Sequence, residues 1–337
     1  MRKVKVQATV LIGLILASSF GVARADHPTV GFGAAIAGPA ITIPATTLAK
    51  GAGAVTIRVE YVKFSAFSDA ELEQFARQGI EAHSVDYLLT PSVSVGYGFT
   101  DDLTVGLRLP YVLRTSIRSG HDEGGDAVVD NHGDSDGVGD IAVLGQYRFL
   151  NNQPNNLECA MLFGIKIPTG TTGVRDKNGV SFETEHQPGS GSWDPLLGTA
   201  ASKRLGAISF DANLLYTFAA RGAQRTNLGD RLHYNLAASY RLGNESHHHS
   251  HETTEHRHLA WDLILEVNGE WQDRQHIAGA VDENSGGSLV YVSPGVRLCG
   301  DNGWAATLSV GIPVIDERNG VQHETDVRTV FGLSKGF

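Results

Sequence analysis

Strict alternation of apolar and polar residues is the feature of this chain that most constrains its fold. Along residues 103–114, every odd position is leucine, valine or tyrosine, whereas Thr104, Arg108 and Arg114 occupy even positions. Residues 261–274 repeat the pattern, with acidic and amide side chains on even positions and tryptophan, leucine and valine on odd ones. Because successive side chains of a β-strand point to opposite faces, each run predicts a strand with one apolar and one polar face.

Twelve such runs can be counted. They are residues 53–67, 85–99, 103–114, 138–150, 157–168, 194–205, 208–220, 229–243, 261–274, 288–299, 303–314 and 324–337. An even number of antiparallel strands with aromatic residues near the strand ends is typical of a bacterial transmembrane β-barrel. A sheet in lipid must close on itself, because an open edge would leave backbone donors unpaired. A soluble β-sandwich is the alternative.

The connections between these runs alternate in length. Long links at 68–84, 120–137 and 169–193 alternate with tight turns such as 100–102 and 205–207. Long extracellular loops and short periplasmic turns are the pattern of outer-membrane barrels. We therefore predict an all-β fold, an antiparallel transmembrane β-barrel of about twelve strands.

Two of the long links carry further signals. Residues 69–78 predict one short extracellular helix, with Ser68 as its N-cap and acidic residues in the first turn. Residues 120–137 combine six aspartate or glutamate residues with glycines, but their spacing lacks the ligand order of a calcium loop. We interpret this link as a solvated acidic loop that could contact lipopolysaccharide through divalent cations.

The N-terminus has the composition of a secretory signal peptide. Basic residues precede an apolar stretch from Ala8 to Phe20, and Ala23 and Ala25 fit a signal peptidase site. The apolar stretch is shorter than the about 20 residues of a membrane helix, which is the alternative. We assign residues 1–25 to the signal peptide, 26–52 to a periplasmic tail or a plug in the lumen, and 53–337 to the barrel.

Charge limits the partners of the mature chain. The full sequence has a net charge of −10, and the four basic residues of the signal peptide have no acidic counterpart, so the mature chain is more acidic still. Such a surface argues against nucleic acid as a partner. The expected surroundings are instead outer-membrane lipid and lipopolysaccharide.

The C-terminus ends in an aromatic residue. Phe331, Leu333 and Phe337 share one parity of the last run. This pattern resembles the terminal signal by which outer-membrane proteins reach the barrel-assembly machinery. Lys335 departs from it, because an apolar residue is usual at that position.

Several short motifs resemble one family. They are Gly137–Asp140, Gln146–Phe149, Gly164–Gly170, Gly189–Asp194 and Ser202–Leu205. Their order and spacing over roughly residues 55–337 resemble the transporter-like barrel family named for the meta-cleavage pathway of phenol degradation. The resemblance implies an outer-membrane barrel for uptake or export of small hydrophobic or aromatic compounds, without catalytic residues.

Inward parity nominates a set of charged residues as lumen-lining. They are Arg58, Glu60, Arg108, Arg114, Asp140, Arg148, Lys166, Glu266, Glu270, Arg297 and Arg328. Opposed carboxylates and guanidinium groups could set a transverse field that selects a solute. Alternatively, these side chains pair with each other in a water-filled interior.

A histidine-rich run in residues 245–258 is the second candidate site. Six of the 14 histidines lie there: His247, His248, His249, His251, His256 and His258. Neutral imidazole is a good ligand for zinc, nickel and copper. No cofactor is required for the fold, but this long periplasmic turn could bind such a divalent transition metal loosely; a polar linker is the alternative.

Three classes of function are open to such a chain: an enzyme, a channel or transporter, and a binding protein. For an enzyme, no serine lies in a nucleophile-elbow sequence, and His121, His132, His186 and His233 have no evident acidic partner. We therefore predict no enzyme, but an outer-membrane channel or transporter for small, hydrophobic or aromatic solutes. The alternative is a barrel that binds metal on its periplasmic side, or a surface partner, through residues 245–258.

Overall fold

The structure, a computed structural model, describes residues 38–242, 259–300 and 302–337. Twelve strands make the barrel wall. They are β1 (Gly53–Ser65), β3 (Tyr87–Thr100), β4 (Leu103–Glu123), β6 (Ile141–Asn152), β7 (Leu157–Ile167), β8 (Asp194–Leu205), β9 (Ile208–Thr217), β11 (Arg231–Leu242), β12 (Leu259–Gln272), β15 (Gly287–Gly300), β16 (Trp304–Arg318) and β17 (Glu324–Gly336). The predicted signal peptide (1–25) and the histidines of 247–258 lie outside the described residues.

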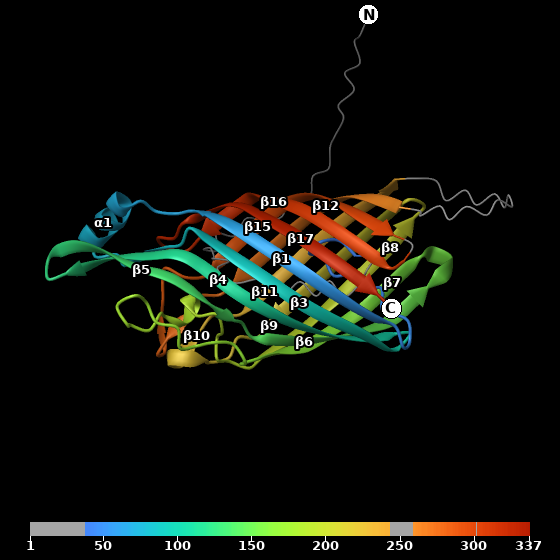
Figure 1. Ribbon diagram of the computed structural model, residues 1–337, viewed down its shortest axis with the longest axis horizontal. Helices are drawn as coiled ribbons and strands as arrows, with labels where there is room; N and C mark the ends of the chain where they lie inside the picture. Colours follow the sequence, from blue (N-terminus) through green and yellow to red (C-terminus); the bar gives the residue numbers. More distant parts are fainter. Residues whose placement is uncertain (1–37, 243–258, 301) are drawn as a thin grey trace, which may run out of the picture.

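The wall is a closed ring of antiparallel strands, tilted against the long axis (Figure 1). The first strand, β1, pairs with β3 on one side and with the last strand, β17, on the other. Each of the twelve predicted runs corresponds to one strand of the wall, with boundaries that differ by a few residues at most ends. The prediction of a twelve-stranded antiparallel barrel is therefore confirmed.

The outer face carries the apolar parity of each strand. Leu107 and Leu263 are 41% and 47% exposed, whereas Arg108 and Asp262, one residue away along the same strands, are buried. Exposed leucine, valine and aromatic side chains continue around the described wall. A closed sheet with apolar residues outside and charges inside suits a barrel surrounded by lipid.

The two ends of the barrel differ. Tight turns such as 101–102 and 206–207 join strands at the end where the chain terminates, and by the usual pattern this is the periplasmic end. The opposite, extracellular end carries the only α-helix of the described residues, α1 (Asp69–Arg77). Within these residues, no helix has the length and hydrophobicity needed to cross a bilayer.

Helix α1 confirms the prediction for residues 69–78. Ser68 accepts a hydrogen bond from the backbone N–H of Glu71, whose carboxylate accepts one from the backbone N–H of Ser68, which is a capping box. The helix packs its Leu72 against β4 at Gly120, where a Cβ atom would lie 2.4 Å from the Leu72 carbonyl oxygen. Glycine at position 120 is thus a condition of this contact.

The link over residues 120–137, interpreted above as a solvated acidic loop, has the structure of a β-hairpin. Strand β4 continues to Glu123, and β5 (Asp126–Val138) returns along it as a hairpin. Gly124 and Gly125 form the turn with positive φ angles of 68° and 102°. A glycine pair is a hairpin signal, and the many aspartates around it concealed the two strands.

Shorter elements complete the extracellular end. β2 (Ala82–Ser84) pairs with β4, and a small separate sheet joins β10 (Thr226–Asn227), β13 (His276–Ile277) and β14 (Ala280–Val281). The described residues also include three 3₁₀ turns: η1 (Gln153–Asn155), η2 (Thr184–His186) and η3 (Ala223–Arg225). Of these turns, η1 lies at the periplasmic end, between β6 and β7.

Candidate functional site

All eleven charged residues nominated by parity lie on the inner face of the wall or of its extracellular continuation. Nine of them are at most 9% exposed. The side chains of Arg148 and Lys166 are 12% and 21% exposed. Their part in a solute pathway stays a prediction.

Many of these charges are paired inside the barrel. The pairs are Arg58–Glu60 at 3.2 Å, Lys166–Asp140 at 2.8 Å, Arg148–Glu158 at 2.6 Å and Arg297–Asp262 at 2.6 Å. The Arg328 guanidinium lies 3.8 Å from the centre of the Tyr291 ring. Because a buried charge is costly without a partner, these contacts favour the interpretation that the interior charges compensate each other.

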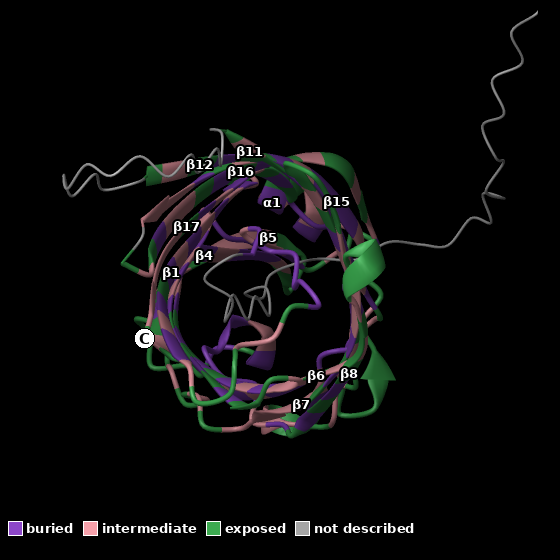
Figure 2. Ribbon diagram, turned by 90° about the vertical axis from the view of Figure 1, so that its right-hand side faces the viewer, coloured by how far each residue is buried: buried purple, intermediate pink, exposed green. Residues whose placement is uncertain are grey.

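A segment before the first strand lies inside the barrel. We call residues 38–50 the N-terminal segment; Figure 2 shows chain inside the ring of strands. The Glu266 carboxylate accepts hydrogen bonds from the backbone N–H groups of Ala40 (2.8 Å), Ile41 (3.2 Å) and Thr42 (2.8 Å), and from the Thr42 hydroxyl. One inward carboxylate thus holds three consecutive residues of the segment.

The same segment packs against apolar residues of the inner wall. Ile43 and Ala45 are buried in a cluster with side chains from β6, β7, β8 and β9. The wall members of this cluster are Ala142, Leu144, Ala160, Leu162, Leu196, Ala200 and Leu215. The inner wall is therefore partly apolar along β6 to β9.

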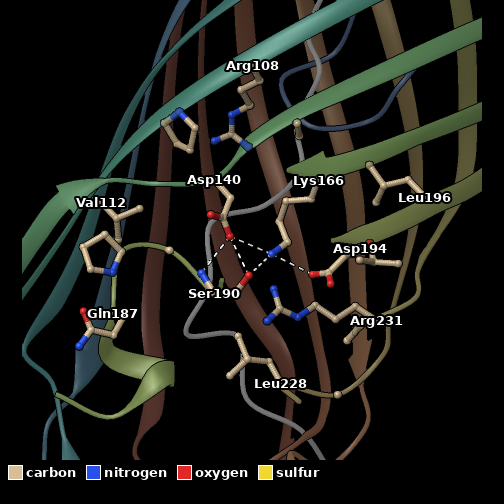
Figure 3. Close-up of a pocket in the computed structure, with 17 residues that line it drawn as sticks. Arg108, Val112, Asp140, Lys166, Gln187, Ser190, Asp194, Leu196, Leu228 and Arg231 are labelled. Carbon is tan, nitrogen blue, oxygen red and sulfur yellow. Dashed lines mark hydrogen bonds and ion pairs between the residues drawn. The ribbon is translucent and has the colours of Figure 1, made fainter. Parts of the chain in front are cut away.

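A second segment enters the barrel from the extracellular end. We call residues 168–193, between β7 and β8, the inner loop. The Ser190 N–H and hydroxyl both donate to the Asp140 carboxylate, at 2.8 and 2.7 Å, and Lys166 also contacts Ser190 (Figure 3). Lys166 Nζ lies 2.9 Å from Asp194 Oδ2 as well, so one ammonium group bridges two carboxylates.

Backbone contacts tighten this attachment. The Gly170 N–H donates to Asp140 Oδ1 at 2.9 Å. A Cβ atom at Gly189 would lie 2.6 Å from the Gly170 carbonyl carbon. The two ends of the inner loop can therefore approach each other only because these residues are glycines.

A cavity of about 100 Å³ lies beside this attachment. Apolar side chains line much of it: Pro110, Val112, Ala142, Leu196, Ala219 and Leu228. Its charges come from Arg108, Arg231, Lys166, Asp140 and Asp194 (Figure 3). The cavity combines an apolar wall with a few polar groups, which is the usual make-up of a small-molecule site.

An acidic pocket lies at the extracellular end. Its volume is about 190 Å³, and Glu81, Glu183, Glu185 and Asp282 line it together with His83. Burial lowers the pKa of His83, but the hydrogen bonds to Glu185 and Glu81 and the charge of Glu183 outweigh it and raise the pKa to about 10. The pocket is therefore rich in negative charge.

The expectation that the scattered histidines lack acidic partners is wrong for three of them. His132 Nδ1 lies 3.0 Å from Asp176 Oδ2, His186 Nε2 lies 3.6 Å from Glu185 Oε1, and His233 Nδ1 lies 3.6 Å from Glu270 Oε2. These pairs join residues far apart in sequence or lie in irregular segments, so alternation gave no signal for them.

Ser119 extends the pair of His132 and Asp176 into a row of three hydrogen-bonded side chains, since its hydroxyl lies 2.8 Å from His132 Nε2. The hydrogen-bonded arrangement of serine, histidine and aspartate is that of a serine hydrolase triad. However, Ser119 is only 6% exposed, and its strand is paired on both sides, with β2 and β5. We interpret these three side chains as a hydrogen-bonded contact that holds the inner loop against the β4–β5 hairpin.

The fold and the lipid-compatible outer face define a bacterial outer-membrane β-barrel protein. The model of the family described as "Putative MetA-pathway of phenol degradation" matches residues 64–323, and the chain belongs to this family. The resemblance found in the sequence motifs is thereby confirmed.

Solved structures share this fold. An outer membrane channel from Pseudomonas putida F1 superimposes with a TM-score of 0.59 at 14% identity, over 87% of this chain and 97% of the channel. Lower scores relate the chain to the monoaromatic hydrocarbon channel CymD (0.46, 14% identity, 94% and 98% covered) and to the TodX deltaS2S3 mutant, a monoaromatic hydrocarbon channel (0.47, 10%, 91% and 95%). No protein of curated function matches the sequence significantly.

Proposed function

We propose that the protein is an outer-membrane channel for small hydrophobic solutes with a single aromatic ring. The observation that carries this proposal is the partly apolar, partly open cavity beside the inner loop in a closed barrel. Its volume of about 100 Å³ has the order of magnitude of the roughly 150 Å³ apolar cavity that holds benzene in a protein interior. A solute of that size would pass between the inner loop and the wall.

The charges of the interior support the same class of solute. Lys166 is shared by Asp140 and Asp194, and Arg297 is paired with Asp262. Compensated charges leave little net field for selecting an ion. An uncharged aromatic solute needs no such field and gains from contact with Val112, Leu196 and Leu228.

Family membership and the similarity to an outer membrane channel support the proposal at the level of the fold. We further propose that the apolar outer face contacts lipid and lipopolysaccharide. We also propose that the barrel-assembly machinery recognises Phe337. The Phe337 backbone pairs with Gly53 while the residue as a whole is 74% exposed, which leaves it accessible to a partner.

Uptake by intact cells tests the proposal. A labelled monoaromatic hydrocarbon is supplied to Gram-negative cells that produce the wild-type protein or the variant Ala219→Trp, which adds bulk to the cavity wall. The matched control is Phe218→Trp, since Phe218 is exposed and does not line the cavity. We expect uptake to fall in Ala219→Trp alone. Equal uptake by all three strains, and by cells without the protein, would refute the proposal.

A further inference from the structure

Four potential metal ligands converge at the extracellular end of the barrel. His83 comes from β2, and Glu183, Glu185 and His186 come from the inner loop at η2. Their ligand atoms all lie within 4.8 Å of one another. Two segments separated by about a hundred residues thus bring two imidazoles and two carboxylates to one point.

The distances fit a tetrahedral ion. His83 Nδ1 lies 2.9 Å from His186 Nε2, 3.5 Å from Glu185 Oε1 and 3.7 Å from Glu183 Oε2, and His186 Nε2 lies 3.6 Å from Glu185 Oε1. Zinc bonds of about 2.0–2.2 Å to nitrogen and oxygen imply ligand separations of roughly 3.3–3.6 Å in a tetrahedron. Shifts of a few tenths of an ångström would bring these four pairs into that range, and the two remaining pairs, Glu183 with Glu185 and with His186, lie within 4.8 Å.

Neighbouring groups hold the ligands in place. Glu81 Oε1 lies 3.8 Å from His83 Nε2, on the side of the ring away from the other ligands, where a carboxylate orients a metal-bound histidine. Gln275 donates to the second oxygen of Glu185 at 2.5 Å. The Ser135 hydroxyl donates to the His186 carbonyl oxygen at 2.7 Å. Each of these contacts fixes a ligand residue without using its coordinating atom.

The surrounding charge favours a cation. Glu81, Glu183, Glu185 and Asp282 line one pocket, and no lysine or arginine is among its lining residues. The side chains of Glu185 and His186 are 17% and 3% exposed, so solvent screens them only in part. A divalent ion would offset this negative charge.

We propose that His83, Glu183, Glu185 and His186 bind a divalent transition metal ion of the zinc class. The ion would join β2 to the inner loop and so fasten that loop at its extracellular end. This site is distinct from the histidines of residues 247–258, which fall between the periplasmic ends of β11 and β12 in the sequence. The proposal does not depend on the channel function.

The test uses zinc as the probe and a background in which the six histidines of 247–258 are changed to serine. Isothermal titration of the detergent-solubilised barrel and elemental analysis then report only other sites. We expect one zinc ion per chain. The substitutions His83→Gln and His186→Gln should each weaken binding at least about tenfold, because loss of more distant supporting groups already costs about 10- to 100-fold.

The matched control is His276→Gln in the same background. His276 lies in β13 at the same end of the barrel but outside the four-residue set. Zinc affinity should not change in this variant. Zinc binding that survives in the His83→Gln/His186→Gln double variant, or absence of binding in the background protein, would overturn the proposal.

Protease protection provides a second readout. Zinc should protect the inner loop from cleavage in the background protein but not in Glu183→Gln/Glu185→Gln, a variant that keeps the shape of both side chains. Heat-modifiable migration on gels checks that each barrel is folded. Equal protection by zinc in both folded proteins would contradict the proposed ligands.

Discussion

Two segments occupy the barrel interior, and they are held in different ways. The N-terminal segment is continuous with the wall only at its β1 end. Its backbone N–H groups donate to the Glu266 carboxylate, and its Ile43 side chain packs against apolar residues of the wall. The inner loop is continuous with β7 and β8 at its two ends, and its Ser190 and Gly170 donate hydrogen bonds to Asp140.

This difference in attachment means that the two segments narrow the barrel interior in different ways. The N-terminal segment is bound by Glu266 and by further inward side chains, among them Asn213, Ser202 and Gln146. Because it is joined to the wall at one end only, we expect it to leave the lumen when water replaces these contacts. The inner loop is joined to the wall at both ends, so we expect it to stay at the barrel even when Ser190 and Gly170 lose their hydrogen bonds to Asp140. We expect the first segment to control the width of the interior and the second to define the cavity.

Removal of the N-terminal segment should have the largest effect. A variant without residues 38–50 loses the chain that fills the lumen beside β6 to β9. Its single-channel conductance in planar bilayers should rise severalfold over the wild type. Unchanged conductance of a folded barrel would show that this segment does not narrow the pathway.

Loss of the central ammonium group should come next. Lys166→Met leaves Asp140 and Asp194 without their shared cation, and the free energy of unfolding should fall by up to about 3 kcal/mol, the low end for breaking a buried pair. Urea titration of the detergent-solubilised barrel measures this loss. The triple variant Asp140→Asn/Lys166→Met/Asp194→Asn, without these charges, should recover part of it; no recovery would argue against a charge effect.

A smaller effect is expected for Glu266→Gln. The amide keeps one acceptor oxygen but loses the charge. The free energy that holds the N-terminal segment in the lumen should therefore fall by about 1.5 kcal/mol, the value of a hydrogen bond to a charged group. Hydrogen exchange of the Ala40, Ile41 and Thr42 amides should then be about tenfold faster. Glu270→Gln on the same strand is the control, and equal acceleration in both variants would contradict the assigned contact.

The smallest effect concerns pH at the tip of the inner loop. The hydrogen bond from His132 outweighs burial and holds the pKa of Asp176 below its usual value of 3.8. The ionised carboxylate therefore stabilises the loop above that value, and the stabilisation is lost as the pH falls through the lowered pKa. NMR signals of the Asn178 and Val180 amides, which donate to Asp176, should report this transition.

The substitution His132→Gln provides the comparison for that titration. Without the imidazole, the midpoint of the transition should move upward towards the usual aspartate value. A midpoint that does not move would assign the low pKa to the two backbone N–H donors instead.

The wall could be predicted from the sequence because a strand between lipid and lumen must alternate at every step. A slip of one residue would turn Arg108 to lipid and Leu107 to the lumen. The capping residues around Ser68 likewise identified α1. These signals depend on residues that are close in the sequence, so they can be recognised without knowledge of three-dimensional contacts.

The contents of the barrel could not be predicted in the same way. The contact of Glu266 with Thr42 spans 224 residues, and that of His83 with His186 spans 103. Neither inner segment shows a regular alternation of apolar and polar residues, because side chains of the wall, and not a neighbouring strand, bind the backbone of each segment. The parity that nominated Glu266 and Lys166 as inward residues did not reveal their partners.

The most direct test of the account is a crystal structure of the protein equilibrated with bromobenzene, with anomalous diffraction used to locate bromine. The account predicts a bromine peak in the cavity beside Val112, Leu196 and Leu228, and its loss in Ala219→Trp. Bromine found only on the lipid-facing outer surface would contradict a solute pathway between the inner loop and the wall.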